Sequence, residues 1–191
     1  MSSEGKEAVA AVSDEATRRL EEIQFDLGEG PGRDAFRVGR PVLVGDIRGA
    51  FSRWPAYAPA ARTAGVGSVF AFPLQLGASR FGALTFYVDR IRILDSAETT
   101  ASLIFAEAAT ETLLDAGPAG SDGTRASIPS SLRFRTEVYQ AQGMVMVDLG
   151  IGLADALARM RAHAFATGID LNVLALEIIA GTTRIALGDE S

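Results

Sequence analysis

Apolar residues in the first 116 positions follow more than one period, and each change of period predicts a new element. Between residues 14 and 27 they recur every three or four positions, which predicts a helix that ends at Gly28. Residues 81–88 alternate in part, which predicts a strand. This order of elements predicts an α+β domain, an antiparallel-rich sheet covered by helices. The elements expected are a strand at 8–12, a helix at 14–27, a strand at 41–47, a short helix at 54–64, strands at 66–76 and 81–88, and a helix at 96–114.

The last 60 residues keep a helical period throughout. Three apolar stripes, broken by glycines, predict helices at 132–149, from 153 to 167, and a short one that Asn172 caps. We therefore expect an all-α bundle of three helices over residues 131–187. Gly143 lies in the middle of the first helix, where glycine costs about 1 kcal/mol relative to alanine. Close packing of the second or third helix across Gly143 and Ala141 would offset that cost.

A stretch rich in Gly, Pro, Ser and Asp separates the two patterns and predicts a flexible linker at 117–130. The 191 residues then divide into domains at 1–116 and 131–187.

Composition excludes several classes of site. The chain has no cysteine and a single histidine, His163, which excludes disulfides, thiolate nucleophiles and zinc sites that use cysteine. Neither a nucleophile–base pair nor a cofactor fingerprint is present, so we expect no enzyme, no metal and no cofactor. Because no apolar run reaches about 20 residues and no signal segment opens the chain, we expect a cytoplasmic protein without a membrane partner.

The glycine-rich run at 28–32 resembles a phosphate-binding loop only superficially. Such a loop needs a strand before the glycines and a helix after them, whereas a helix is predicted before this run. We interpret these residues as turn glycines.

Hydrogen-bond donors are concentrated on the first two C-terminal helices. The net charge of −6 argues against non-specific nucleic-acid binding, but residues 131–187 hold five arginines and five acids and are neutral. An ordinary solvated surface, with Arg159 paired to Asp155 one turn away, is the simplest interpretation. The alternative is a surface that contacts phosphates and base edges. The candidate RNA-binding residues are Arg133, Arg135, Gln140, Gln142, Arg159, Arg161 and His163.

Residues 132–185 resemble the ANTAR family. The resemblance lies in the runs VYQAQGMVM at 138–146, LARMRAHA at 157–164 and LNVLALEIIAG at 171–181. It implies a three-helix RNA-binding domain that controls transcription termination, acts as a dimer and binds RNA with paired hairpins. One departure is Gln142, where the family often has lysine.

Residues 8–116 resemble a GAF domain of the kind that is fused to ANTAR. The run LEEIQFDLGEGPGRDA at 20–35 carries most of this likeness, with support from Trp54-Pro55 and Gly82-Ala83-Leu84. The first strand of that fold is missing, so we expect a second chain or the C-terminal region to cover the open sheet edge, unless the true start lies upstream. Five aromatic residues are expected in the core, or else around a pocket for an unidentified small ligand, namely Trp54, Tyr57, Phe70, Phe72 and Phe86.

Two functions follow from these patterns. The first is an RNA-binding regulator of the antitermination type, a homodimer with a GAF-like sensory or dimerisation module. The second is a sensory or interaction protein that binds no RNA and dimerises through the helix at 96–114.

Overall fold

The computed structural model describes residues 9–115 and 130–185, and the side chains of residues 9–114 and 136–185. The chain divides into two compact units, one beginning at Asp14 and the other containing the C-terminal helices. Each unit is described separately below. The predicted linker at 117–130 lies almost wholly outside the described residues.

The first unit is mixed α+β, as predicted. Its three strands form one antiparallel sheet in the order β1-β2-β3, and β2 and β3 form a long hairpin. Among the described residues β3 pairs only with β2, so its other edge has no strand partner. The elements are α1 (Glu15–Leu27), α2 (Pro31–Val38), β1 (Val42–Val44), the 3-10 helix η1 (Ile47–Ala50), α3 (Tyr57–Thr63), β2 (Ser68–Leu76), β3 (Ser79–Val88) and α4 (Ser96–Asp115).

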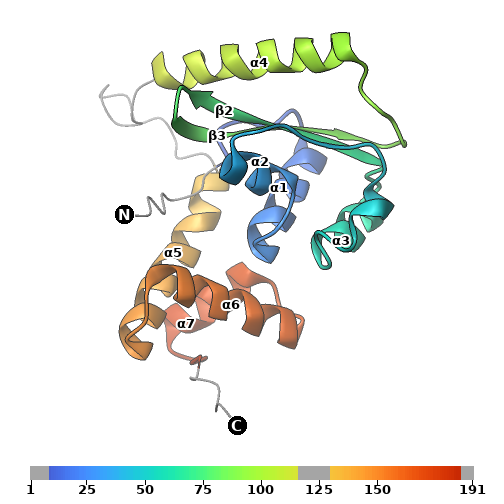
Figure 1. The fold of residues 1–191 in the computed structure, drawn as a ribbon. Helices are drawn as coiled ribbons and strands as arrows, with labels where there is room; N and C mark the ends of the chain where they lie inside the picture. Colours follow the sequence, from blue (N-terminus) through green and yellow to red (C-terminus); the bar gives the residue numbers. More distant parts are fainter. Residues whose placement is uncertain (1–8, 116–129, 186–191) are drawn as a thin grey trace. The chain divides into compact units, whose positions relative to one another are not determined.

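The sheet is covered on both sides. Alternate residues of β2 point to opposite faces, so Phe70 and Phe72 pack toward α4 while Val69 and Ala71 pack toward Trp54 and its neighbours. Figure 1 shows α4 along one side of the sheet, with α1, α2 and α3 on the other. The unit therefore has two small cores, one on each face.

The structure differs from the sequence analysis in two places between residues 9 and 38. Residues 9–12 form no strand, because a short apolar run carries no signal that distinguishes a strand from an extended segment. The helix α2 was not predicted, because its first two residues, Pro31 and Gly32, are typical of turns. The turn at Gly28 and Gly30 is confirmed, since both have positive φ, at 70° and 143°.

Glu29 explains why this turn is closely packed. Its carboxylate accepts hydrogen bonds from the backbone N–H groups of Ala56 and Tyr57, at 2.6 and 2.7 Å, and so caps the start of α3. The glycine-rich run is thus a structural junction between three helices.

The second unit contains three helices, α5 (Ser130–Leu149), α6 (Leu153–Thr167) and α7 (Leu171–Ala180). Their buried stripes, which include Val138, Ala141, Met160 and Leu174, agree with the predicted helical period. The cap of α7 is Asp170 and not Asn172, because the Asp170 carboxylate accepts from two N–H groups of the first turn.

The packing predicted across Gly143 is wrong. A Cβ atom added there would meet nothing within 4 Å, whereas its neighbour Ala141 is fully buried. Two positions along a helix lie about 200° apart, so Ala141 faces the bundle and Gly143 faces away from it.

Within the described ranges, no single helix is both long and apolar enough to cross a bilayer, although α5 and α6 reach that length together across a 106° bend.

Candidate nucleic-acid interface

Arg159 is the clearest candidate for contact with an anion. Its guanidinium takes part in no ion pair or hydrogen bond with the described residues, so the pair with Asp155 that the sequence allowed does not form. The Asp155 carboxylate lies instead near the start of its own helix, where an added Cβ on Gly152 would be 3.5 Å from it. The positive end of the α6 dipole favours an acid at that position.

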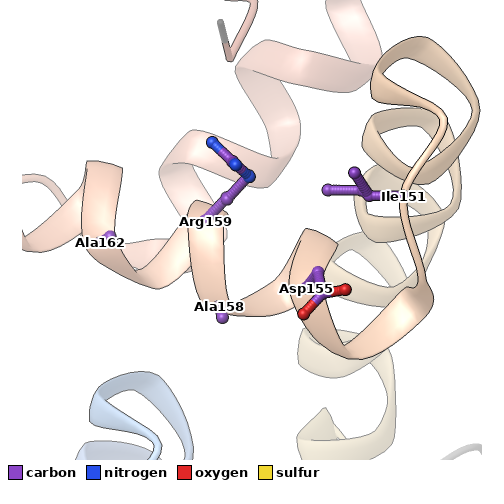
Figure 2. A pocket seen from close by; sticks show the side chains of 5 residues that line it. All are labelled: Ile151, Asp155, Ala158, Arg159 and Ala162. Atoms are coloured by element: carbon purple, nitrogen blue, oxygen red, sulfur yellow. The ribbon is translucent and has the colours of Figure 1, made fainter. Parts of the chain in front are cut away.

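A shallow hollow of about 350 Å³ lies beside this guanidinium. Small side chains line it, since Ala158 directly precedes Arg159 on α6 and Ala162 lies three residues after it, and Ile151 adds an apolar wall. Figure 2 shows the Arg159 and Ile151 side chains pointing toward one another, with the Asp155 carboxylate turned away from both. The hollow therefore combines a cation with apolar surface.

His163 extends the same side of α6. It lies four residues after Arg159, one helical turn away, and the two side chains are neighbours. Arg161 lies two residues from each of them, about 200° around the helix, so it belongs to the other side. All three side chains are half-buried, but Arg161 is also engaged within the chain. The single arginine face that the sequence suggested is therefore divided between two sides of α6.

The two glutamines of α5 have different environments. Gln140 is exposed, and its amide makes no hydrogen bond to the described residues. Gln142 has only 7% of its surface exposed, and its Nε2 donates to the carbonyl oxygen of Leu153 at 2.7 Å. This bond ties α5 to the start of α6, so we exclude Gln142 from the interface. Arg133 and Arg135 lie in the first turns of α5, and their side chains are outside those described.

Phe165 is a candidate that the sequence analysis missed. Its ring is 70% exposed on α6, one turn after Arg161. A signal was present, because Phe165 directly follows Ala164 and so falls outside the stripe of Met160 and Ala164. Exposed aromatic rings are common platforms for unpaired bases in RNA-binding proteins.

The five aromatic residues of the first unit do not line one pocket. Trp54 and Tyr57 are buried on the face of the sheet that α1, α2 and α3 cover, and their rings meet edge to face with their centroids 5.8 Å apart. The other three, Phe70, Phe72 and Phe86, belong to the core beneath α4. A cavity of about 420 Å³ near β1 contains only Phe70 of this set, beside Leu43, Gly45, Asp46, Ile91, Ile93 and Leu94.

A buried polar cluster lies under α1. Gln24 donates to the Tyr87 hydroxyl at 2.7 Å, and that hydroxyl donates to the Glu21 carboxylate at 2.8 Å. The Gln24 carbonyl oxygen accepts from the N–H of Gly32 at 2.9 Å. The Tyr57 hydroxyl is close enough to affect the pKa of Tyr87, but it forms no hydrogen bond of good geometry. Burial raises the pKa of both tyrosines, and the nearby Glu21 charge raises them further.

The described residues contain no group of three or more side chains that could hold a metal ion. Comparison with protein-family models, with curated proteins and with solved structures found no match to this chain. The interpretation of the interface therefore depends on its own geometry and on the sequence patterns.

Proposed function

We propose that this protein is an RNA-binding regulator of the antitermination type, which uses its three-helix unit to bind structured RNA hairpins. The observation that carries the proposal is the Arg159 guanidinium, which has no partner among the described residues and lies beside a shallow hollow, with His163 one turn away on the same side. A guanidinium of this kind binds phosphate through two parallel hydrogen bonds, and an RNA backbone presents closely spaced phosphates.

Each part of the surface has a distinct task in this proposal. Arg159 and His163 contact phosphate and the exposed Gln140 amide contacts a base edge, while a splayed base stacks on Phe165 on the Arg161 side of α6. The α+β unit serves as a GAF-like sensory or dimerisation module, with any small ligand still to be identified. The sequence likeness of both segments to GAF and ANTAR domains supports this division of labour.

Fluorescence anisotropy with an RNA of two tandem hairpins tests the proposal. Changing Arg159→Ala and His163→Ala together should weaken binding about tenfold or more, because two phosphate contacts are lost. Arg62→Ala is a matched control, since it removes one exposed arginine from the other unit and should leave affinity unchanged.

The salt dependence gives a second measure. With two phosphate contacts, from Arg159 and His163, log K should fall with log salt at a slope of roughly −1.5. An unchanged affinity in the double variant would refute this surface. If the wild-type chain binds no hairpin RNA, the proposed RNA-binding function is refuted. That result would favour the alternative function, a sensory or interaction protein that binds no RNA.

A further inference from the structure

The outer side of α4 is apolar, which is unusual for a helix that covers a sheet. The inner side is identified by Ala106 and Thr110, which are buried toward the sheet. Because each residue advances about 100° around a helix, a second set lies on the opposite side. Its members are small or apolar and all exposed, namely Ala97, Ala101, Ile104, Phe105, Ala108 and Thr112.

Two large side chains at the centre of this strip are open to solvent. Ile104 is 61% exposed and Phe105 is 65% exposed. The strip continues for about 22 Å along the helix axis, from Ala97 to Thr112. Single exposed apolar residues are ordinary, but a continuous apolar strip marks a surface that meets another molecule.

The spacing of the strip indicates what that molecule is. Its six positions are symmetric about the midpoint between Ile104 and Phe105. An antiparallel copy of the same helix, centred on that midpoint, would set Ile104 against Phe105, Ala101 against Ala108, and Ala97 against Thr112. Large residues then meet at the centre, and the small ones on either side let the two backbones approach closely.

We propose that α4 is a homodimer interface, at which the α4 helices of two copies of this chain pair antiparallel about a two-fold axis between Ile104 and Phe105. The contact is isologous, as is usual for soluble dimers. It is separate from the RNA-binding surface and does not depend on RNA binding.

Charge favours the antiparallel arrangement. α4 contains no lysine or arginine, and three of its four acids, Glu107, Glu111 and Asp115, lie in its C-terminal half. Parallel pairing would place each of these acids beside its own copy. Antiparallel pairing places them beside the N-terminal half of the other helix, where the dipole is positive and Arg92 neutralises Glu98.

The size of the strip sets the expected affinity. One helix pair buries less than the roughly 800 Å² per partner of a standard interface, so the dimer should dissociate on dilution. Light scattering over about a hundredfold range of concentration should show this equilibrium for the full chain. Changing Ile104→Glu and Phe105→Glu should raise the dimer dissociation constant at least about tenfold, since four charges would be buried at the axis.

A matched control is Leu76→Glu at the hairpin end of β2, because Leu76 is also 65% exposed. It adds the same kind of charge outside α4 and should leave the dimer intact. Circular dichroism of each variant checks that the fold is kept, as expected for changes at exposed positions.

Cysteine cross-linking tests the register, and the chain has no cysteine of its own to interfere. A mixture of an Ala101→Cys chain and an Ala108→Cys chain should form disulfide-linked dimers under mild oxidation. Each chain alone should not, because equal positions would be separated by about 10 Å along the axis, beyond the reach of a disulfide.

Three results would overturn the proposal. The first is a monomer at every concentration, which would mean that the C-terminal unit of the same chain or another partner covers the strip. The second is a dimer that the glutamate variant does not weaken. The third is cross-linking of each single-cysteine chain as fast as the mixture, which would indicate parallel pairing.

Discussion

Tyr57 and Tyr87 lie in the same buried cluster but differ in hydrogen bonding. The Tyr87 hydroxyl accepts from Gln24 and donates to Glu21, whereas the Tyr57 hydroxyl has no partner of good geometry among the described residues. A buried hydroxyl without a hydrogen bond loses its hydration and gains nothing in return. The two residues should therefore respond differently to removal of that oxygen.

Tyr87→Phe should lower the free energy of unfolding by about 1–2 kcal/mol at pH 7, because Gln24 and Glu21 lose a partner. Tyr57→Phe should leave it nearly unchanged. Fluorescence of Trp54, the only tryptophan, follows the unfolding of this unit during a urea titration. Equal losses from the two variants would contradict the assignment of hydrogen bonds.

The pH dependence has a definite sign. Both pKa values are raised above 10 in the folded state, so the folded chain keeps protons that the unfolded chain releases above about pH 10. Stability from these residues is therefore constant below that pH and falls above it, by about 1.4 kcal/mol per pH unit for each tyrosine. Either phenylalanine variant should reduce this fall of stability with pH. An unchanged fall in both variants would contradict the raised pKa values of the two tyrosines.

The helix α5 presents one packed side and one open side. Ala141 and Gln142 face the bundle, and Gln142 joins α5 to the first residue of α6. Gly143 and the 72% exposed Val147 face away from the bundle. No described residue packs against Gly143, so nothing described in this unit requires a glycine there. A molecule that approaches the open side of α5 closely would require one.

Gly143→Ala should raise the free energy of unfolding by about 0.5–1 kcal/mol, because a helical glycine at an open site is replaced by the best helix former. If the open side of α5 contacts RNA, the same variant should also weaken RNA binding. Circular dichroism melts and anisotropy titrations measure the two effects. A destabilised variant would contradict the open environment of Gly143, because it would mean that the added methyl group clashes with a neighbour.

The proposed dimer joins two RNA-binding units in one particle. Two hairpins on one RNA could then be bound together, and the second contact would benefit from a high effective concentration. The α4 surface and the Arg159 surface would thus act together although they lie on different units.

The full chain should accordingly bind a tandem-hairpin RNA at least about tenfold more tightly than a single hairpin. Changing Ile104→Glu and Phe105→Glu should abolish this preference while leaving the single-hairpin affinity unchanged. Anisotropy titrations with both RNAs measure the ratio. If the glutamate variant still prefers the tandem hairpin, the preference does not come from pairing of the α4 helices.

Local periodicity was sufficient to predict most elements. The stripes of α1, α5 and α6 and the turn of the β2–β3 hairpin depend on neighbours within a few residues, so the sequence contains their signal directly. The Gly30–Pro31 junction is the counterexample, because its residues favour a turn locally. Glu29 joins it to the start of α3, and Gln24 joins Gly32 to Tyr87 of β3.

Which candidate residues are available for an interface could be decided only from the folded chain. Gln142 and Gln140 are equivalent in composition and spacing, but only the packing of α5 against α6 decides that one is buried and the other exposed. The division of the five aromatic residues between two cores has the same cause, because the face that a side chain occupies depends on which elements the sheet brings to it. Residue type and period are local properties, whereas burial is a property of the assembled elements.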